Sequence, residues 1–286
     1  MFFLQPSTLQ LLRFKFSFFL MPVFLFALSC IENMDWGKAI LIGIILHLIV
    51  YPASNGYNSF MDRDTQAIGG IKNPMQPTKQ LFYVTIGLDI LALALSFLVS
   101  QTFVAFMLLY IISSRLYSYR KIRLKQYAIL GYITVIINQG AIIFLAVYWG
   151  ASLDLIEHIP WLLLIASSCL IGGFYPITQI YQHEQDAADN VKTISMLLGK
   201  KGTFVFCAIA YALAFLLLFF HYQSVQQISN FIVLQLMFLP IIFYFLKWFF
   251  RVLKDEKEAN FEKTMFMNVL ASSFTNLAFI VLIFIK

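Results

Sequence analysis

The sequence predicts an all-α, polytopic membrane protein with nine transmembrane helices, and two observations lead to this fold class. Of the 286 residues, 60% are hydrophobic and only 12% are charged, whereas soluble domains average about 45–50% and about 25%. Apolar stretches long enough to cross a bilayer recur along the whole chain. The three cysteines, Cys30, Cys169 and Cys207, stand singly in apolar runs, so we expect buried thiols rather than disulfides or metal ligands. The composition, the apolar stretches and the isolated cysteines together exclude a disordered chain, a secreted disulfide scaffold and an ordinary soluble enzyme.

Each element follows from the length of its apolar run, because a helix needs about 20 apolar residues to cross the membrane. We expect spans near Ser17–Cys30, Lys38–Phe60, Leu81–Ser100, Thr102–Ser118, Ala128–Trp149, Trp161–Tyr181, Thr203–His221, Phe231–Phe250 and Met265–Ile285. Only Ser100 and Gln101 separate the third span from the fourth. A single helix from Leu81 to Ser114 would be about 50 Å long, which is too long for one crossing. We therefore expect two helices and a tight turn.

The placement of Lys and Arg predicts the orientation of the chain. With the N-terminus inside, every Lys and Arg except Lys38 and Lys286 falls in the N-terminal arm or in a cytoplasmic loop, in accord with the positive-inside rule. The sequence thus predicts a cytoplasmic N-terminus and an outer C-terminus, in an inner or plasma membrane.

The first span has a competing interpretation as a signal peptide. Arg13 and Lys15, the apolar run after them and the segment Ala27-Leu28-Ser29-Cys30 resemble such a peptide with a lipidation cysteine. However, Ala27 stands where a leucine is expected, and cleavage would leave eight spans that begin on the wrong side. We expect an ordinary first helix.

Polar residues gather at the predicted cytoplasmic ends of two spans. Asn55, Asn58, Ser59, Asp62 and Gln66 close the second span at spacings that place them on one helical face. At the end of the sixth span, Gln182 and Asp186 also share a face, and the cationic segment Tyr117–Lys125 lies between the two clusters in sequence.

These clusters have the chemistry that a diphosphate requires. Carboxylate and amide oxygens suit Mg²⁺, and Lys and Arg side chains neutralise phosphate charge. The alternative is that they are solvated groups at helix ends, but their recurrence four helices apart favours a shared site. The offset suggests one transmembrane domain, residues 1–286, with two four-helix units, about 1–125 and 126–260, and a final helix over 264–286.

At these residues the chain resembles the UbiA superfamily of intramembrane prenyltransferases, over nearly its whole length. In the family's first motif, Asn-Asp-x-x-Asp-x-x-x-Asp, Asn58 and Asp62 match, whereas Ser59 and Gln66 replace acidic residues.

The second motif of the family is Asp-x-x-x-Asp followed by Gly-hydrophobic-Lys-Thr. Asp186 matches its second Asp, Gln182 replaces its first, and Asn190 replaces its Gly. Tyr117 and Lys121 match the family's Tyr-x-x-x-Lys element.

The resemblance implies a UbiA-like bundle that transfers an isoprenoid group from an allylic diphosphate to an acceptor, with Mg²⁺-assisted departure of pyrophosphate. It implies catalytic roles for Asp62, Asp186, Lys121 and Tyr117, metal ligation by Asn58, Asp62, Asp186 and Gln182, and diphosphate binding by Arg63, Lys121, Arg123 and Lys192. Each replacement of an acidic residue removes a negative charge from the site. We therefore expect the site to bind one Mg²⁺ with the diphosphate, and cationic side chains to neutralise more of the diphosphate's charge.

Polar residues deeper in the spans are candidates for the acceptor end of the cavity. Asn138 and Gln139 are expected to line an acceptor pocket or to hydrogen-bond between helices. Asp89, near the middle of its span, is expected to be protonated or paired, because an isolated charge there is costly.

Two alternative functions stay open from the sequence. One is an isoprenoid-diphosphate cyclase or lyase on the same scaffold, which needs no acceptor. The other is a non-catalytic or transport-type membrane protein that kept the fold. The replacement of acidic residues in the motifs favours this second alternative. The expected partners are an isoprenoid diphosphate, a membrane-soluble or aromatic acceptor and bilayer lipid, without nucleic acid.

Overall fold

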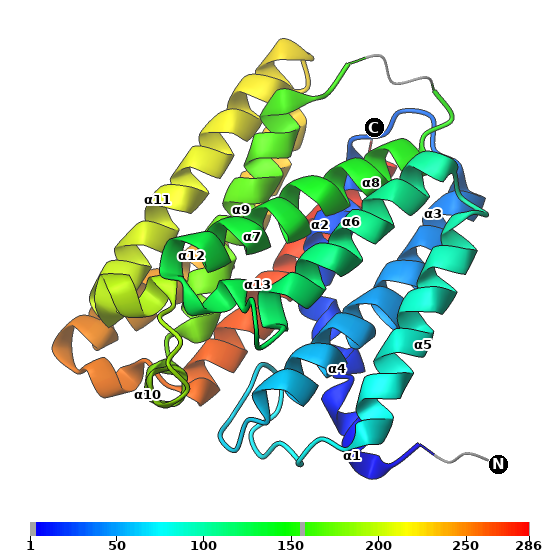
Figure 1. Ribbon diagram of the computed structural model, residues 1–286. Helices are drawn as coiled ribbons and strands as arrows, with labels where there is room; N and C mark the ends of the chain where they lie inside the picture. The colour runs from blue at the N-terminus through cyan, green and yellow to red at the C-terminus, as the bar shows by residue number, and fades with distance from the viewer. Residues whose placement is uncertain (1–3, 155–157, 286) are drawn as a thin grey trace.

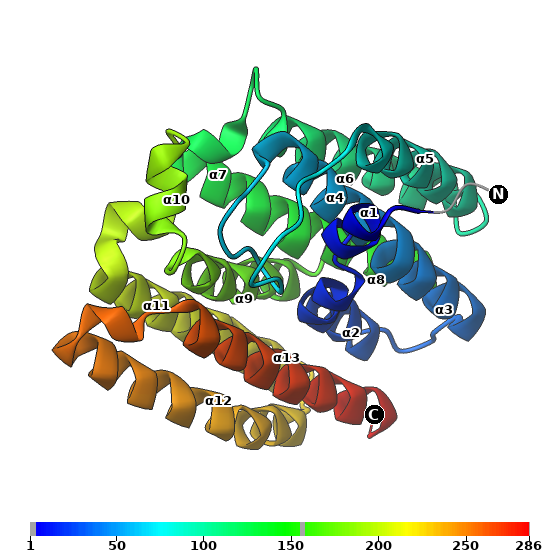
Figure 2. The ribbon, with the colours of Figure 1, turned by 90° about the horizontal axis from the view of Figure 1, so that it is seen from below.

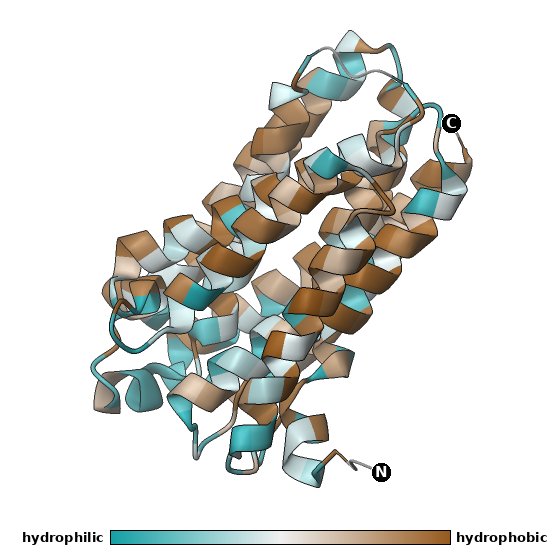
Figure 3. Cartoon of the chain, turned by 45° about the vertical axis from the view of Figure 1, so that its right-hand side comes forward, coloured by the Kyte–Doolittle hydropathy of each residue, from teal (hydrophilic) through white to brown (hydrophobic). Residues whose placement is uncertain are grey.

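The structure, a computed structural model, describes residues 4–154 and 158–285. Lys286, one of the two basic residues expected outside the cytoplasmic segments, lies outside these ranges. The described residues form helices and contain no β-strand, and the long helices run side by side (Figure 1). Figure 3 shows apolar residues along their middle portions and polar residues gathered toward their ends. This is the all-helical membrane fold that the sequence predicts.

Eight helical stretches of the described chain are long and apolar enough to cross a membrane. They are Pro6–Ser29, Trp36–Asp62, Lys79–Ser96, Ala128–Ala151, Trp161–Gln179, Ile194–Ser224, Ile228–Lys254 and Phe261–Phe284. The protein is therefore a multi-pass integral membrane protein. The count of nine spans, the side on which each terminus lies and the division into two four-helix units stay predictions.

The predicted fourth span is α6 (Gln101–Ser118), which is not among these eight stretches. Polar residues, Arg115 among them, lower its mean hydropathy. α6 follows α5 (Lys79–Ser96) after a short turn and packs beside it (Figure 1). The Ser100 hydroxyl caps α6 by accepting a hydrogen bond from the Phe103 N–H (3.0 Å). A single continuous helix through this region is thus excluded.

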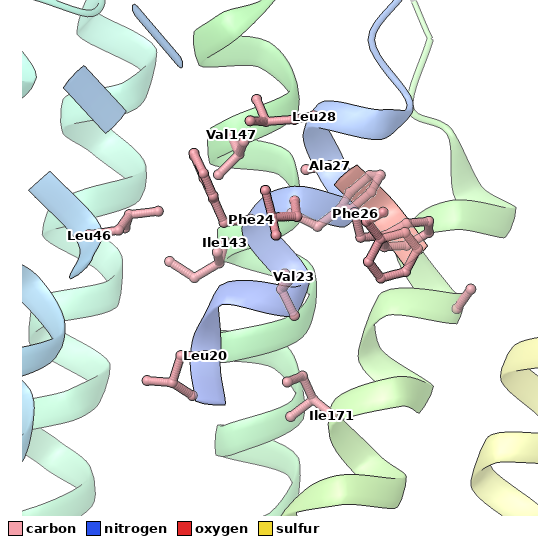
Figure 4. Close-up of a cluster of buried hydrophobic side chains, with 14 of the residues drawn as sticks. Leu20, Val23, Phe24, Phe26, Ala27, Leu28, Leu46, Ile143, Val147 and Ile171 are labelled. Carbon is pink, nitrogen blue, oxygen red and sulfur yellow. The ribbon is translucent and has the colours of Figure 1, made fainter. Parts of the chain in front are cut away.

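The first span begins earlier than the sequence predicts. It consists of α1 (Pro6–Leu11), the 3₁₀ segment η1 (Phe14–Leu20) and α2 (Met21–Ser29). Arg13, with a φ of 49°, turns the chain between α1 and η1. α2 lies in the core, where Phe26 and Ala27 are fully buried, and Figure 4 shows its apolar side chains beside Ile143 and Ile171. The segment therefore enters the bundle as two helices joined by a 3₁₀ segment.

Two of the spans contain a π-helical turn. The second span is α3 (Trp36–Ile44), η2 (Ile45–Val50) and α4 (Tyr51–Asp62), and the fifth is α7 (Ala128–Val135), η4 (Ile136–Ile142) and α8 (Ile143–Ala151). Such turns widen the helix locally and are frequent at functional sites. η4 presses closely on its neighbour, because a Cβ added at Gly140 would lie 2.7 Å from the Cα of Ser168.

The second half of the chain contains α9 (Trp161–Gln179), the short α10 (His183–Ala188), α11 (Ile194–Ser224), α12 (Ile228–Lys254) and α13 (Phe261–Phe284), with a short 3₁₀ turn, η5 (Glu256–Glu258), before α13. Another 3₁₀ turn, η3 (Leu124–Gln126), precedes α7. α11 packs along α9, and α12 packs against α11 and α13 (Figure 2). α10 and the end of α4 lie at the same end of the bundle (Figure 1). We call this end, where α4 and α9 finish, the polar end.

The expectation that Asp89 is protonated or paired is confirmed, because it has a partner. Asp89 on α5 forms an ion pair with Arg115 on α6, whose Nε donates to Asp89 Oδ2 at 2.9 Å. The Arg115 guanidinium also lies 4.0 Å from the centre of the Tyr57 ring. Of the three cysteines, which the sequence predicts to be buried thiols, Cys207 is buried, whereas Cys30 and Cys169 are only partly buried.

Candidate active site

The first polar motif ends α4 and then turns sharply. Arg63 adopts the left-handed conformation, with a φ of 54°, and its N–H donates to the carbonyl of Ser59 (3.1 Å). Because the helix stops at Asp62, Gln66 does not continue the face of Asn58 and Asp62, which corrects the prediction, and its side chain is exposed. The turn instead brings Asp64 back to line a cavity. Had the helix continued past Asp62, Asp64 would have lain on a different helical face.

The second motif meets the first directly. α9 ends at Gln179, and α10 forms a separate helix across the polar end. Gln185 on α10 donates from Nε2 to Asp64 Oδ1. Gln182 donates to the carbonyl of Ala67 at 3.5 Å. The two motif segments, which are more than 100 residues apart in sequence, are therefore in contact.

A cationic loop joins both motifs. In residues 119–127, which we call the basic loop, Arg123 donates to Asp62 Oδ1 (3.3 Å) and also pairs with Asp189. Lys125 forms an ion pair with the other oxygen of Asp62. Arg120 donates to Asp189 (2.7 Å) and to the carbonyl of Met61 (2.7 Å). The basic loop thus fastens the end of α4 to the end of α10.

The cations that line the cavity are not the ones that the sequence predicts. Lys121, Arg63 and Lys192 have exposed side chains and do not line the cavity. Lys125, which the sequence analysis did not select, lines it. The reason is a tight turn in which the N–H groups of Ile122 and Arg123 both donate to the Tyr119 carbonyl. The turn leaves Lys121 in solvent and returns the chain toward Asp62.

The cavity at the polar end has a volume of about 200 Å³ and lies between η1, α4, α6, η4 and α9. Its lining includes the predicted residues Asn58, Asp62, Tyr117, Asn138, Gln139 and Gln182. Along α4 the lining extends from Ser54 to Asp62, which corresponds to about 12 Å at 1.5 Å per residue. The cavity therefore reaches from the acidic residues well into the bundle.

The walls of this cavity differ in character. Phe16, Leu20, Ile171 and Phe174 give an apolar surface on the side of η1 and α9. Ser54, Tyr110, Ser114, Asn138 and Gln139 give a polar surface, the polar wall, on the side of α4, α6 and η4. Between the two, the hydroxyls of Tyr117 and Tyr175 are hydrogen-bonded, and Gln179 Nε2 donates to Tyr175 (2.8 Å).

Three carboxyl groups, Asp62, Asp64 and Asp186, form what we call the acidic cluster. Burial raises the pKa of Asp64 to about 6, and the neighbouring charge of Asp62 adds to the increase. Burial raises the pKa of Asp186 to about 7; Lys125 opposes this increase, whereas Asp62 and Asp64 reinforce it. The charges of Asp62 and Asp64 thus disfavour ionisation of Asp186. A bound cation would relieve that repulsion.

Arg13 contributes a second cation that the sequence analysis did not assign to the site. It lines the cavity from the break between α1 and η1. Its guanidinium donates to the carbonyls of Asn55 (3.3 Å) and Gly69 (3.5 Å), and its Nε has no partner among the described residues. The sequence offers no signal for this role, because Arg13 resembles an ordinary basic residue of a cytoplasmic arm.

The donor set fits Mg²⁺ when substrate oxygens complete it. Among the described residues, no group of three or more His, Cys, Asp or Glu side chains is placed to hold an ion by itself. Mg²⁺ commonly binds one or two carboxylates together with phosphate oxygens and water. The acidic cluster, with Asn58 and Gln182 beside it on the cavity lining, supplies ligands of that kind.

The fold and the site together define an integral membrane protein with a cavity that is acidic and cationic at one end and has an apolar wall and a polar wall farther in. The model of the UbiA prenyltransferase family matches residues 18–270. The chain belongs to this family. No curated protein matches the sequence.

Solved structures share the fold over nearly the whole chain. A UbiA homolog from Archaeoglobus fulgidus bound to GPP and Mg²⁺ superposes with a TM-score of 0.72 at 19% identity, covering 97% of this chain and 99% of that chain. The same homolog bound to DMAPP and Mg²⁺ gives 0.72 at 18% identity, with coverages of 98% and 100%. The apo UbiA homolog from Aeropyrum pernix K1 gives 0.70 at 18%, with coverages of 94% and 98%. At these identities the likeness establishes the fold.

Proposed function

We propose that this protein is an intramembrane prenyltransferase that moves an isoprenoid group from an allylic diphosphate to an acceptor in the same cavity. One observation carries the proposal. Asp62, Asp64, Lys125 and Arg13 line one end of a cavity that has an apolar wall as well as a polar wall farther in, and Asp186 lies near this end without lining the cavity. A diphosphate requires charged ligands such as those at this end of the cavity, and an isoprenoid chain requires an apolar wall.

Family membership and the related structures support this assignment. The Archaeoglobus fulgidus homolog has been solved with GPP and Mg²⁺ and with DMAPP and Mg²⁺. Both compounds combine a diphosphate head with a short isoprenoid tail. The cavity described above offers matching surfaces for a head and a tail of this kind.

We assign the diphosphate end to residues of three segments. One or two carboxylates of the acidic cluster, with amide oxygens of Asn58 and Gln182, would hold one Mg²⁺ together with oxygens of the diphosphate. That ion, when bound, supplies charge stabilisation for the departing pyrophosphate.

Lys125 and Arg13 neutralise the remaining phosphate charge in our proposal. They take over the role that the sequence predicted for Lys121, Arg63 and Lys192, because these three side chains point into solvent. Arg123 orients Asp62 through its hydrogen bond of 3.3 Å.

The proposed reaction breaks the bond between C1 of the allylic group and the diphosphate oxygen, which keeps the electron pair. C1 then bonds to the nucleophilic atom of the acceptor, which releases a proton. Tyr117, Tyr175 and Phe174 line the intervening part of the cavity. Aromatic faces attract a developing cation, and the enclosing helices limit the access of water to it.

The test measures pyrophosphate release from GPP by the purified full-length protein with Mg²⁺ and a panel of aromatic and hydroxylated acceptors. We expect acceptor-dependent release that falls at least 100-fold in Asp62→Asn and Asp186→Asn. Asp154→Asn, at the opposite end of the bundle and bonded to Asn33, is the matched control and should retain activity. Release without an acceptor would instead indicate a cyclase or lyase, and no release under any condition would refute the proposal.

A further inference from the structure

The last part of α12 carries three exposed cations on one helical face. We propose that Lys247, Arg251 and Lys254, which we call the α12 cations, form a binding surface for the headgroup of an anionic phospholipid. This inference is independent of the proposed function, because the lining of the cavity described above includes no residue of α12.

The α12 cations continue an apolar stripe that faces lipid. α12 lies at the edge of the bundle (Figure 2), and its opposite face is buried, with the Trp248 ring 4.8 Å from the Phe204 ring of α11. Leu236, Phe243 and Phe250 are 60%, 71% and 60% exposed. They recur every seven residues, close to two helical turns, and therefore share one face. The α12 cations, spaced i, i+4 and i+7, extend that face to the end of the helix.

This end of α12 lies at the polar end of the bundle. The ion pair between Glu262, in the first turn of α13, and Lys72, in the loop after α4, joins the two regions at 2.7 Å. The α12 cations therefore stand where the lipid-facing surface of the helix meets the polar end. In a bilayer, the phospholipid headgroups lie at this level.

The carboxylates near the α12 cations are already engaged. Residues 255–262 contain four acids, and each has a partner. The partners are the Lys257 N–H for Asp255 (3.0 Å), Lys201 for Glu256 (3.7 Å), Lys263 for Glu258 and Lys72 for Glu262 (2.7 Å). None of the α12 cations forms an ion pair within the part of the chain that the structure describes. Their positive charge is thus left for an outside partner.

The helix dipole explains only part of this charge. Arg251 and Lys254 stand in the last turn of α12, where cations stabilise the end of a helix. Lys247 stands seven residues before Lys254, about 10 Å along the axis at 1.5 Å per residue. The effect of the dipole does not extend beyond the last turn. A lysine on a lipid-facing surface at that depth gains more from an anion that reaches it from the bilayer.

The chemistry of the surface selects one class of lipid. Every phospholipid has a phosphate group, but phosphatidylcholine also carries a quaternary ammonium group, which the α12 cations repel. Phosphatidylglycerol has no such group, and its net negative charge is attracted by each nearby Lys and Arg. The exposed side chains of Phe243 and Phe250 lie beside the cations and suit acyl chains. This apolar contact favours a lipid over a free phosphate ion.

The experiment titrates two lipids separately into the purified full-length protein in detergent. The lipids are phosphatidylglycerol and phosphatidylcholine with identical acyl chains, and native mass spectrometry gives the apparent Kd of each. We expect phosphatidylglycerol to bind at least about fivefold more tightly. Equal affinities would overturn the proposal whether or not any variant folds. The same holds if inorganic phosphate, at constant ionic strength, abolished the difference, because the surface would then bind a free anion.

Two variants of equal charge then locate the surface. Lys247→Gln/Arg251→Gln/Lys254→Gln should lose the preference for phosphatidylglycerol. Arg63→Gln/Lys121→Gln/Lys192→Gln is the matched control, because it removes the same charge from exposed loops at the same end, and it should keep the preference. A folded α12 variant that keeps the preference would overturn the proposal, and so would an equal loss in both variants, which would reflect net charge alone.

Discussion

Lys125 and Asp62 form an ion pair that closes the polar end of the cavity, although 63 positions separate them in sequence. The Lys125 side chain is 13% exposed and that of Asp62 is 3% exposed. Because the pair is largely shielded from water, its charges act more strongly than those of surface groups. In our proposed function, this ion pair holds Lys125 where the diphosphate of a substrate would lie.

The first prediction separates the two lysines of the basic loop. Lys125→Met should lower the rate of pyrophosphate release from GPP about 100-fold, because it removes a charge that faces the departing group. Lys121→Met should change the rate less than about threefold, because its side chain lies in solvent. Steady-state rates of both variants test this difference. A larger loss in Lys121→Met would restore the role that the sequence motif implies.

The second prediction concerns the stability of the acidic cluster as a function of pH. An unfolded Asp has a pKa of about 3.9, whereas Asp64 and Asp186 have pKa values of about 6 and about 7 in the folded protein. Between about pH 4 and pH 7 the folded state therefore retains protons that the unfolded state releases. These two groups thus make the free energy of unfolding fall as the pH rises through this window.

Removing one of the carboxyl groups should reveal this effect. Asp186→Asn should unfold at a higher temperature than the wild-type protein at pH 8 and at a similar temperature at pH 4.5, while its activity is lost. Because other groups titrate in the same range, the test is the difference between the two proteins, measured by thermal unfolding without Mg²⁺. A difference that is the same at both pH values would contradict the assigned repulsion, and Asp154→Asn serves as the control.

The third prediction concerns the buried pair between α5 and α6. Arg115→Leu should lower the free energy of unfolding by about 3–5 kcal/mol, because Asp89 would keep a buried charge without its partner. The double variant Asp89→Leu/Arg115→Leu should recover most of that loss. Denaturation in mixed micelles provides the measurement.

A matched surface pair offers the comparison for this cycle. Lys72 and Glu262 are bonded at 2.7 Å, but their side chains are 67% and 62% exposed. Glu262→Gln should therefore alter stability little, because solvent screens such pairs. If breaking either pair lowered the free energy of unfolding by a similar amount, burial would not explain the contribution of the Asp89–Arg115 pair.

The fourth prediction tests the close contact between η4 and α9. Gly140→Ala should destabilise the protein by about 1–3 kcal/mol, because the added Cβ would lie 2.7 Å from the Cα of Ser168 and the helices would have to separate. Gly87→Ala on α5 is the control, since a Cβ there meets no atom within 4 Å. Alanine favours a helix over glycine by about 0.5–1 kcal/mol, so Gly87→Ala should be neutral or stabilising. Equal effects of the two substitutions would argue against the close packing.

The sequence predicted the fold class and the position of most helices because both depend on local patterns. An apolar run of about 20 residues forms a spanning helix wherever it lies in the chain. The separation of α5 from α6 could be predicted because one helix would have exceeded the thickness of the bilayer. The two polar motifs were also visible, because amides and carboxyls at helix ends stand out in an apolar chain.

Only the tertiary structure decided which polar side chains face one another. The backbone conformation of Arg63 excludes Gln66 and brings in Asp64, and a turn at Tyr119–Arg123 selects Lys125 over Lys121. Arg13 reaches the cavity because the helix is interrupted between α1 and η1, and no sequence pattern predicted this interruption. Hydropathy reports how each residue partitions between water and lipid, which the sequence alone determines. The direction of a polar side chain depends instead on backbone turns and on contacts between segments that are distant in sequence.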